Sequence, residues 1–322
     1  MPSIRGIVDR IGKYVHYGAK PEAPPPITTR TAVLLLVAYT VIYVAPFYLS
    51  SRTRPSAQLS RDAPSVIKAR VASVTLSCIA CSAVTFYMVT KDGHVSSEGA
   101  LHLLGYWPIG LAESARSLFL TALLFLGPLF ENIVVEAGWK DWMALRPLYD
   151  LFGEWTTWRN IVAGPFTEEV LFRSAGVPLM LLARTSVSKT IFLSPVVFGL
   201  AHLHHFYEFR LTHPRVPCVQ AALRSVFQFA FTTLFGAYAT FLYLRGGSLL
   251  AVTLVHAFCN SLGLPRFWGR VRVVTADDPD GERSASPLWT VAYYVLLLAG
   301  ATLFYRNFWT LTQSQMELIS LK

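Results

Sequence analysis

This chain of 322 residues is short of charged side chains, which make up only 15% of it. Soluble domains carry about 25% Asp, Glu, Lys and Arg. Four long stretches contain none of these residue types: 31–49, 71–90, 225–244 and 284–305. Each is close to the roughly 20 residues that a helix needs to cross a bilayer. Buried helices of a large soluble protein would need amphipathic helices to cover them, so the pattern predicts an integral membrane protein.

Several other features are missing. Residues 1–30 have no apolar core followed by a small-residue cleavage site, which excludes a cleavable secretory signal and indicates an N-terminal tail over 1–28. No Gly-x-Ser-x-Gly elbow or His-Glu-x-x-His helix is present, which argues against a serine hydrolase and a compact zinc helix. Cys78 and Cys81 have redox spacing but lie in an apolar run, so packing is the better interpretation for them, as for Cys218 and Cys259.

The charges that are present are mostly basic, with a net charge of +9. They flank the apolar runs, as Arg61, Lys68 and Arg70 do, and as Arg266 and Arg270 do. The positive-inside rule and anionic lipid headgroups explain this pattern without a nucleic-acid partner. Both sides of the first span are basic, so charge alone does not orient the chain.

The hydropathy pattern predicts an all-α, polytopic bundle of about eight transmembrane helices in a single domain over 29–322, with no internal repeat. The Trp-rich stretch 134–158 is expected at the membrane interface, because Trp favours the headgroup layer. The acidic segment 275–287 is expected to be a solvated turn. The predicted helices are 29–49, 71–90, 113–130, 166–183, 190–207, 221–244, 247–264 and 287–306.

Three segments of the predicted helices bring clusters of ionisable residues into apolar surroundings, which is costly in a membrane and usually functional. The first holds Glu168, Glu169 and Arg173, shortly after Pro165. Glu169 and Arg173 are four residues apart and can pair on one helical face. Glu168 points roughly 100° away and is left free for proton transfer. The pattern therefore predicts a structural role for the carboxylate of Glu169 and leaves the carboxylate of Glu168 available for proton transfer.

Histidines and an asparagine mark the other two helices. His202 and His205 share one helical face, and His256 and Asn260 share another. Burying polar groups on three separate helices is costly, so we expect these side chains to meet in one hydrated pocket. A carboxylate, imidazoles and an amide at such a site would deprotonate water and stabilise an oxyanion.

The motifs Glu-Glu-x-x-x-Arg, Phe-Gly-x-Ala-His and His-x-x-x-Asn, in this order, resemble those of the CAAX prenyl protease 2 family, the Rce1-type glutamate intramembrane proteases. The similarity covers about 158–264, and the Ala-His-Leu-His-His string is similar to the eukaryotic branch. The resemblance implies a single membrane-embedded protease domain over 29–322 with its catalytic core at 158–264. It also implies a multi-pass protein of the endoplasmic reticulum membrane.

The activity implied is removal of the last three residues from proteins with a farnesylated or geranylgeranylated cysteine, such as Ras-like small GTPases. By the same resemblance, Glu168 is the general base and His202 assists it. His256 and Asn260 hydrogen-bond the oxyanion, while Glu169 and Arg173 have a supporting role. No cofactor or metal is implied, membrane lipid is the surrounding partner, and His204 and His205 receive no role.

Three questions stay open from the sequence. Glu168, His202 and His256 would also suit a zinc-dependent peptidase of the same substrate class, because zinc accepts His and carboxylate ligands. A proton-coupled transporter would use buried Glu, His and Arg as a relay, although the polar helices lie in one half of the chain without symmetry. The aromatic residues over 227–241 predict either a lipid groove or ordinary lipid-facing packing.

Overall fold

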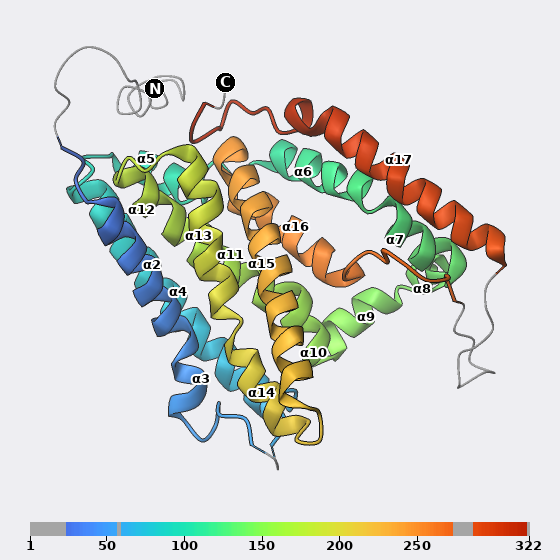
Figure 1. Ribbon diagram of the computed structural model, residues 1–322. Coiled ribbons are helices and arrows are strands. Elements are labelled where there is room, and N and C mark those ends of the chain that lie inside the picture. The colour runs from blue at the N-terminus through green and yellow to red at the C-terminus, as the bar shows by residue number, and fades with distance from the viewer. Residues whose placement is uncertain (1–23, 57–58, 273–285, 321–322) are drawn as a thin grey trace.

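The computed structural model describes residues 24–56, 59–272 and 286–320, and within these ranges the chain is helical without a β-strand. Figure 1 shows long helices that cross the molecule beside shorter, broken ones. Most of the N-terminal tail and of the acidic segment 275–287 lies outside the described residues.

The first helical layer consists of α2 (Thr29–Val44), the short α3 (Pro46–Leu49) and α4 (Pro64–Lys91). The side chain of Thr28 caps α2 by accepting a hydrogen bond from the backbone N–H of Thr31. The hydroxyl groups of Tyr39 and Thr85 lie 3.0 Å apart and connect α2 to α4. This layer is followed by the short α5 (Ser97–Leu103).

The central element is one long helical path with two π-helical segments. It comprises α10 (Trp155–Trp158), η2 (Arg159–Ala163), α11 (Gly164–Glu169), η3 (Val170–Ala175) and α12 (Gly176–Leu182). The prediction of a helix from 166 is wrong at its start, because the helix begins eleven residues earlier, at Trp155. The missing N–H of Pro165 is accommodated next to the wider π register of η2 instead of ending the helix.

Two further long elements pack against this path. These are α13 (Val187–Ala201) and α15 (Cys218–Gly246), which lie side by side in Figure 1 and contact each other extensively. The predicted helix 190–207 is interrupted after Ala201, and α14 (His204–Thr212) continues in a new direction. The break is a tight turn in which the N–H of His202 bonds to the carbonyl of Gly199, three residues back.

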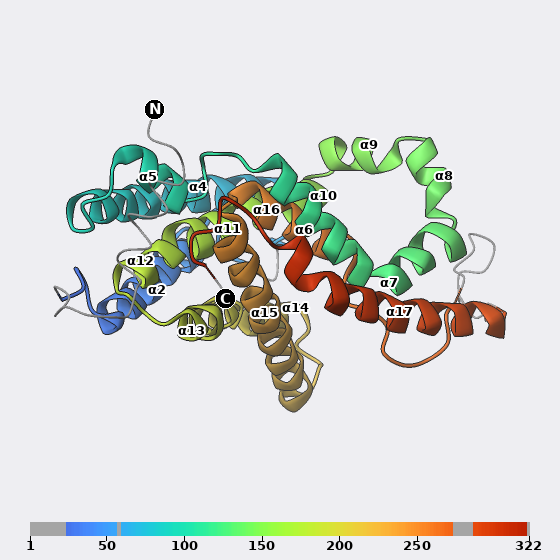
Figure 2. The same ribbon diagram turned by 90° about the horizontal axis from the view of Figure 1, so that it is seen from above.

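The remaining helices are α6 (Leu111–Leu124), α7 (Leu126–Phe130), η1 (Glu131–Val135), α16 (Leu249–Leu262) and α17 (Pro287–Leu311). The predicted helix 113–130 is bent by 81° at Phe125. The Trp-rich stretch forms α8 (Gly138–Met143) and α9 (Arg146–Gly153), which contain no buried residue and project from the edge of the bundle in Figure 2. Its place at a membrane interface stays a prediction.

Four helices in the described part are long and apolar enough to cross a membrane, or five if the bent pair is one span. The fold is therefore a polytopic helical membrane protein, as predicted, but the number of eight spans is not confirmed. At most 39% of the residues in each of the four apolar windows are buried in the protein, so most of these residues are available to lipid. The four helices cover Thr29–Leu49, Pro64–Lys91, Cys218–Gly246 and Pro287–Leu311.

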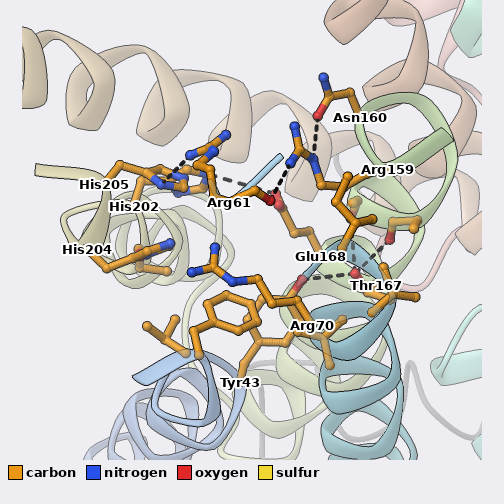
Figure 3. Close-up of a pocket in the computed structure, with 18 of the residues that line it drawn as sticks. Tyr43, Arg61, Arg70, Arg159, Asn160, Thr167, Glu168, His202, His204 and His205 are labelled. Atoms are coloured by element: carbon orange, nitrogen blue, oxygen red, sulfur yellow. Dashed lines mark hydrogen bonds and ion pairs between the residues drawn. The ribbon is translucent and has the colours of Figure 1, made fainter. Parts of the chain in front are cut away.

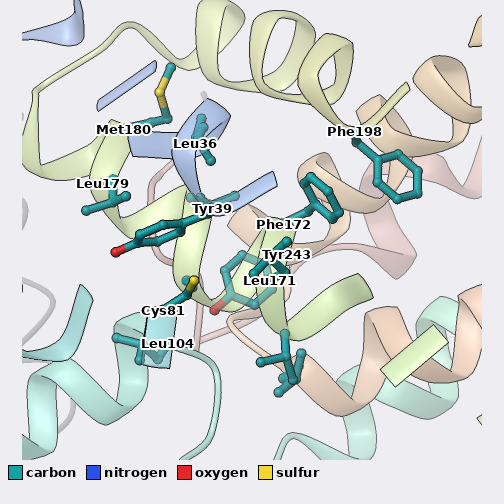
Figure 4. Packing of buried hydrophobic residues seen from close by; sticks show 14 of the residues in the cluster. Leu36, Tyr39, Cys81, Leu104, Leu171, Phe172, Leu179, Met180, Phe198 and Tyr243 are labelled. Carbon is teal, nitrogen blue, oxygen red and sulfur yellow. The ribbon is translucent and has the colours of Figure 1, made fainter. Parts of the chain in front are cut away.

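The main core surrounds η3 and α12. All six residues of η3 are buried, and Leu171, Leu179 and Met180 are almost fully enclosed. Figure 4 shows Leu179 and Met180 beside Leu36 and Tyr39 of α2, and Leu171 near Tyr243. Because interiors of this density tolerate little displacement, the core holds the polar turn of α11, immediately before η3, in a fixed position.

Candidate active site

Glu168 lies between two imidazoles contributed by separate helices. Its Oε2 is 3.9 Å from Nε2 of His202, at the end of α13, and 3.9 Å from Nε2 of His256, on α16. These distances exceed a direct hydrogen bond and suit a contact bridged by one water molecule. The three motifs of the sequence therefore meet at one carboxylate, and this carboxylate is only 22% exposed.

His202 is oriented by its own helix. Its Nδ1 lies 2.9 Å from the carbonyl oxygen of Phe198. A carbonyl only accepts hydrogen bonds, so Nδ1 carries the proton. In the neutral ring Nε2 is then unprotonated, and it faces Glu168 (Figure 3). The backbone thus selects the tautomer whose unprotonated Nε2 is able to accept a proton on the side that faces Glu168.

Glu169 is buried behind Glu168 and binds two partners. Its Oε1 accepts hydrogen bonds from Nη1 of Arg173 at 3.0 Å and from Nδ1 of His256 at 2.7 Å. The guanidinium of Arg173 also lies 4.5 Å from the ring centroid of Phe198. Glu169 and Arg173 are 0% and 1% exposed, so the pair has no access to water. The sequence suggests the contact with Arg173 but not the one with His256, which joins residues 87 positions apart.

Asn260 reaches the site from α16, one helical turn after His256. Its Nδ2 donates to the backbone carbonyl of Asn160, 3.0 Å away. In η2 the N–H of Gly164 bonds to Arg159, and the next residue, Pro165, has no N–H to give. The carbonyl of Asn160 therefore lacks its usual intrahelical donor, and the asparagine amide takes that place.

Two cavities of different character meet at this centre. One, of about 1170 Å³, is lined mainly by apolar side chains, among them Phe231, Phe235, Tyr238 and Phe241 of α15. The other, of about 190 Å³, is lined by many polar groups and is shown in Figure 3. Glu168, His202, His205 and Asn260 line both, while His256 lines the apolar one. Of the six aromatic residues singled out in the sequence, these four line the apolar cavity, while Phe227 is 56% exposed.

The polar cavity contains residues that the sequence does not single out as a site. Arg61, Arg70 and Arg159 line it, and the first two also bind the carboxylate of Glu208 on α14. The motifs give no sign of this arrangement, because the basic residues stand in segments that read as headgroup-facing loops. Glu208 follows the His204–His205 pair by one helical turn, which is the single local signal available.

His204, His205 and Glu208 are the group of described residues with metal-ligand spacing, since one ligand atom of each lies within 4.8 Å of the others. Glu208 is already held by Arg70 at 2.7 Å and by Arg61 at 3.1 Å. A divalent ion there would face two guanidinium groups at the same carboxylate, which is electrostatically unfavourable. We therefore assign His204, His205 and Glu208 to the hydrogen-bonded network that lies beside the polar cavity and not to a metal centre.

A multi-helix membrane bundle with a carboxylate between imidazoles at the junction of a polar and an apolar cavity has the architecture of an intramembrane hydrolase. Residues 151–262 match the family described as Type II CAAX prenyl endopeptidase Rce1-like. No solved structure matches the chain.

Curated relatives agree with this match. The chain is 36% identical over 279 residues to the probable CAAX prenyl protease 2 of Schizosaccharomyces pombe, covering 87% of this chain and 93% of the relative. It is 31% identical over 258 residues to human CAAX prenyl protease 2, covering 77% and 78% of the two chains. It is 42% identical over 143 residues to the protein of this name from Arabidopsis thaliana, covering 44% and 43%. The chain belongs to the Rce1-like family of CAAX prenyl endopeptidases and is a membrane-embedded peptidase.

Proposed function

We propose that this protein cleaves the peptide bond that follows the prenylated cysteine of CAAX proteins and releases the C-terminal tripeptide. The family membership and the relatives' names support the substrate class. The observation that carries the chemistry is the position of Glu168, whose Oε2 lies 3.9 Å from two imidazole nitrogens. In the proposed mechanism a single water molecule contacts all three groups.

In this mechanism Glu168, assisted by His202, takes a proton from water as the oxygen attacks the carbonyl carbon of the prenylcysteine. The resulting oxyanion accepts hydrogen bonds from Nε2–H of His256 and from the side-chain amide of Asn260. The proton taken by Glu168 then passes to the leaving nitrogen, and the C–N bond breaks. The products are a prenylcysteine carboxylate and a tripeptide with a new amino group.

In this mechanism His256 donates to the oxyanion through an Nε2–H group. Nδ1 already donates to Glu169 at 2.7 Å. With His256 doubly protonated, the two positive charges of His256 and Arg173 balance the two negative charges of Glu168 and Glu169. A buried, hydrogen-bonded set of groups with no net charge avoids the large cost of an uncompensated buried ion. Glu169 and Arg173 therefore position His256 in this scheme.

The apolar cavity suits the isoprenoid chain. It opens beside Glu168 and is bordered by aromatic side chains of α15, including Phe235 and Tyr238. A farnesyl or geranylgeranyl group is an extended hydrocarbon, and aromatic surfaces bury it favourably. We propose that Ras-like small GTPases are among the substrates and that the protein works in the endoplasmic reticulum membrane, surrounded by lipid.

The proposal is tested with purified protein, a farnesylated CAAX peptide and the same peptide without the lipid, each with and without a strong chelator. We expect release of the tripeptide from the farnesylated peptide alone, at the same rate in chelator. Loss of activity in chelator, restored by zinc, would support the zinc peptidase instead. Failure to cleave either peptide would contradict the proposed function.

A further inference from the structure

The polar cavity is lined by more positive than negative side chains. Three arginines line it: Arg61 from the segment before α4, Arg70 from α4 and Arg159 from η2. Glu168 is the one carboxylate among the described lining residues. Figure 3 shows the three guanidinium groups around the space beside Glu168, with Arg159 on the side of Asn160 and Arg61 and Arg70 on the side of the histidines.

Two neighbouring carboxylates balance only part of this charge. Glu208, which is 3% exposed, accepts from Arg61 and Arg70, and Asp62 accepts from Nη1 of Arg159 at 2.7 Å. Burial alone would raise the pKa of Asp62, but the hydrogen bond and the charge of Arg159 outweigh burial and lower that pKa, so Asp62 stays ionised. Three guanidinium groups and these two carboxylates leave one positive charge within the pocket, with Glu168 as the remaining carboxylate on the cavity wall.

Arg70 and Arg159 are held in place and still have donors to offer. Nε of Arg70 donates to the carbonyl of Thr53 at 2.9 Å, and Nε of Arg159 donates to Oδ1 of Asn160 at 3.0 Å. Among the described residues, no hydrogen bond is made by Nη1 of Arg70 or by Nη2 of Arg159. These side chains are 12% and 20% exposed. Pre-oriented guanidinium groups with free N–H donors are the usual receptor for a carboxylate.

We propose that this basic pocket binds the C-terminal carboxylate of the tripeptide that is released, with Arg70 and Arg159 as the principal donors. The inference rests on the proposed function and adds the residues that recognise the end of the substrate. The scissile bond divides the substrate into a hydrocarbon part and a short peptide ending in one negative charge. The two cavities that meet at Glu168 have the matching characters, one apolar and one basic.

The same contact would fix where the chain is cut. Three extended residues reach at most about 10 Å. A carboxylate held in the basic pocket therefore places only peptide bonds within that reach beside Glu168. Recognition of the chain end, and not of particular side chains, then sets the length of the fragment that is removed.

The test compares two farnesylated peptides that differ only at the C-terminus, one a free acid and the other a carboxamide. The ratio of their kcat/KM values is measured for the wild-type protein, Arg70→Ala, Arg159→Ala and the control Arg146→Ala. Arg146 is 70% exposed on α9 and binds Asp141. We expect the wild-type protein and the control to prefer the acid by about 10- to 100-fold, the scale of a charge-assisted hydrogen bond. In the two pocket variants the ratio should fall toward one.

Because both peptides are measured on the same preparation, loss of folded protein lowers both rates and leaves the ratio unchanged. Arg70→Lys and Arg159→Lys replace any alanine variant that does not accumulate, and they should lower the ratio in the same direction. Equal cleavage of acid and amide by the wild-type protein, or an unchanged ratio in both pocket variants, would overturn the carboxylate pocket. If the wild-type protein cleaves neither peptide, the proposed function itself fails.

Discussion

Nδ1 of His256 lies 2.7 Å from Oε1 of Glu169, so the second glutamate of the Glu-Glu pair is bonded to the helix that carries the two proposed oxyanion donors. The two glutamates are adjacent in sequence but differ completely in surroundings. Glu168 faces both cavities, whereas Glu169 is fully buried between Arg173 and His256. This contrast predicts different consequences for mutations at neighbouring positions.

Replacement of Glu168 should remove catalysis without unfolding the protein. In Glu168→Gln the shape is kept and the proton acceptor is lost, so kcat for tripeptide release should fall by about 10²–10⁴-fold or more, and Glu168→Ala should behave alike. The measurement is release of tripeptide from a farnesylated peptide by the purified variant. Glu98→Gln, at an exposed position on α5 that lines neither cavity, serves as the control. Retained activity in Glu168→Gln would rule out Glu168 as the general base.

Glu169 and Arg173 should behave as a structural pair. Removal of one partner leaves a buried charge uncompensated, which costs about 3–5 kcal/mol. Glu169→Gln and Arg173→Leu are therefore expected to accumulate poorly in membranes and to melt at lower temperature in detergent, in addition to having low activity. Glu131→Gln, which removes a partly exposed pair with Arg266, should have a much smaller effect on melting. Normal accumulation and melting of both Glu169→Gln and Arg173→Leu would contradict this assignment.

His202→Ala should abolish tripeptide release, because Glu168 then loses the imidazole that assists it. His256→Ala and Asn260→Ala each remove one proposed oxyanion donor, and kcat should fall by about 10²–10³-fold in each. The affinity for a non-cleavable farnesylated peptide should change little, since the oxyanion forms only during the reaction. A variant with unchanged kcat and weakened binding would indicate a substrate-binding role instead.

Gly199 permits the close approach of α13 and α15. A Cβ atom at this position would lie within 3.0 Å of the ring of Phe229 and closer still to Oγ1 of Thr233. Gly199→Ala should therefore push the helices apart and displace His202, with a loss of about 1–3 kcal/mol in stability and a larger loss in kcat. The double variant that adds Thr233→Ala to Gly199→Ala should recover part of the lost stability and part of the lost kcat. Gly153→Ala, where a Cβ meets open space, should melt like the wild-type protein.

The motifs of the sequence name residues that the structure brings together at Glu168, because each motif stands on a helix whose periodicity is visible in the sequence. The convergence of Glu168 with His202 and His256 follows from the cost of burying such groups separately. The break at His202 and the early start of the central helix at Trp155 are not visible, because both depend on π or tight turns that the packed structure selects.

The basic pocket also could not be predicted from the sequence, and the reason is different. Arg61 and Arg70 have the spacing of residues that flank a membrane span, and their sequence context is the same whether they face headgroups or protein. Their role depends on Glu208, which lies more than 130 positions away in the sequence. Contacts of this range have no local pattern, so only the folded chain reveals them.

The meeting of the two cavities at one carboxylate affects how a lipidated chain is handled in each turnover. Withdrawal of a prenyl group from the bilayer into water would cost about 0.8 kcal/mol for each CH₂ group, or on the order of 10 kcal/mol for a farnesyl chain. Under the proposed mechanism, Glu168 between the apolar and the polar cavity acts on the backbone while each half of the substrate stays in surroundings of matching polarity. The lipidated product and the tripeptide would then leave through different cavities.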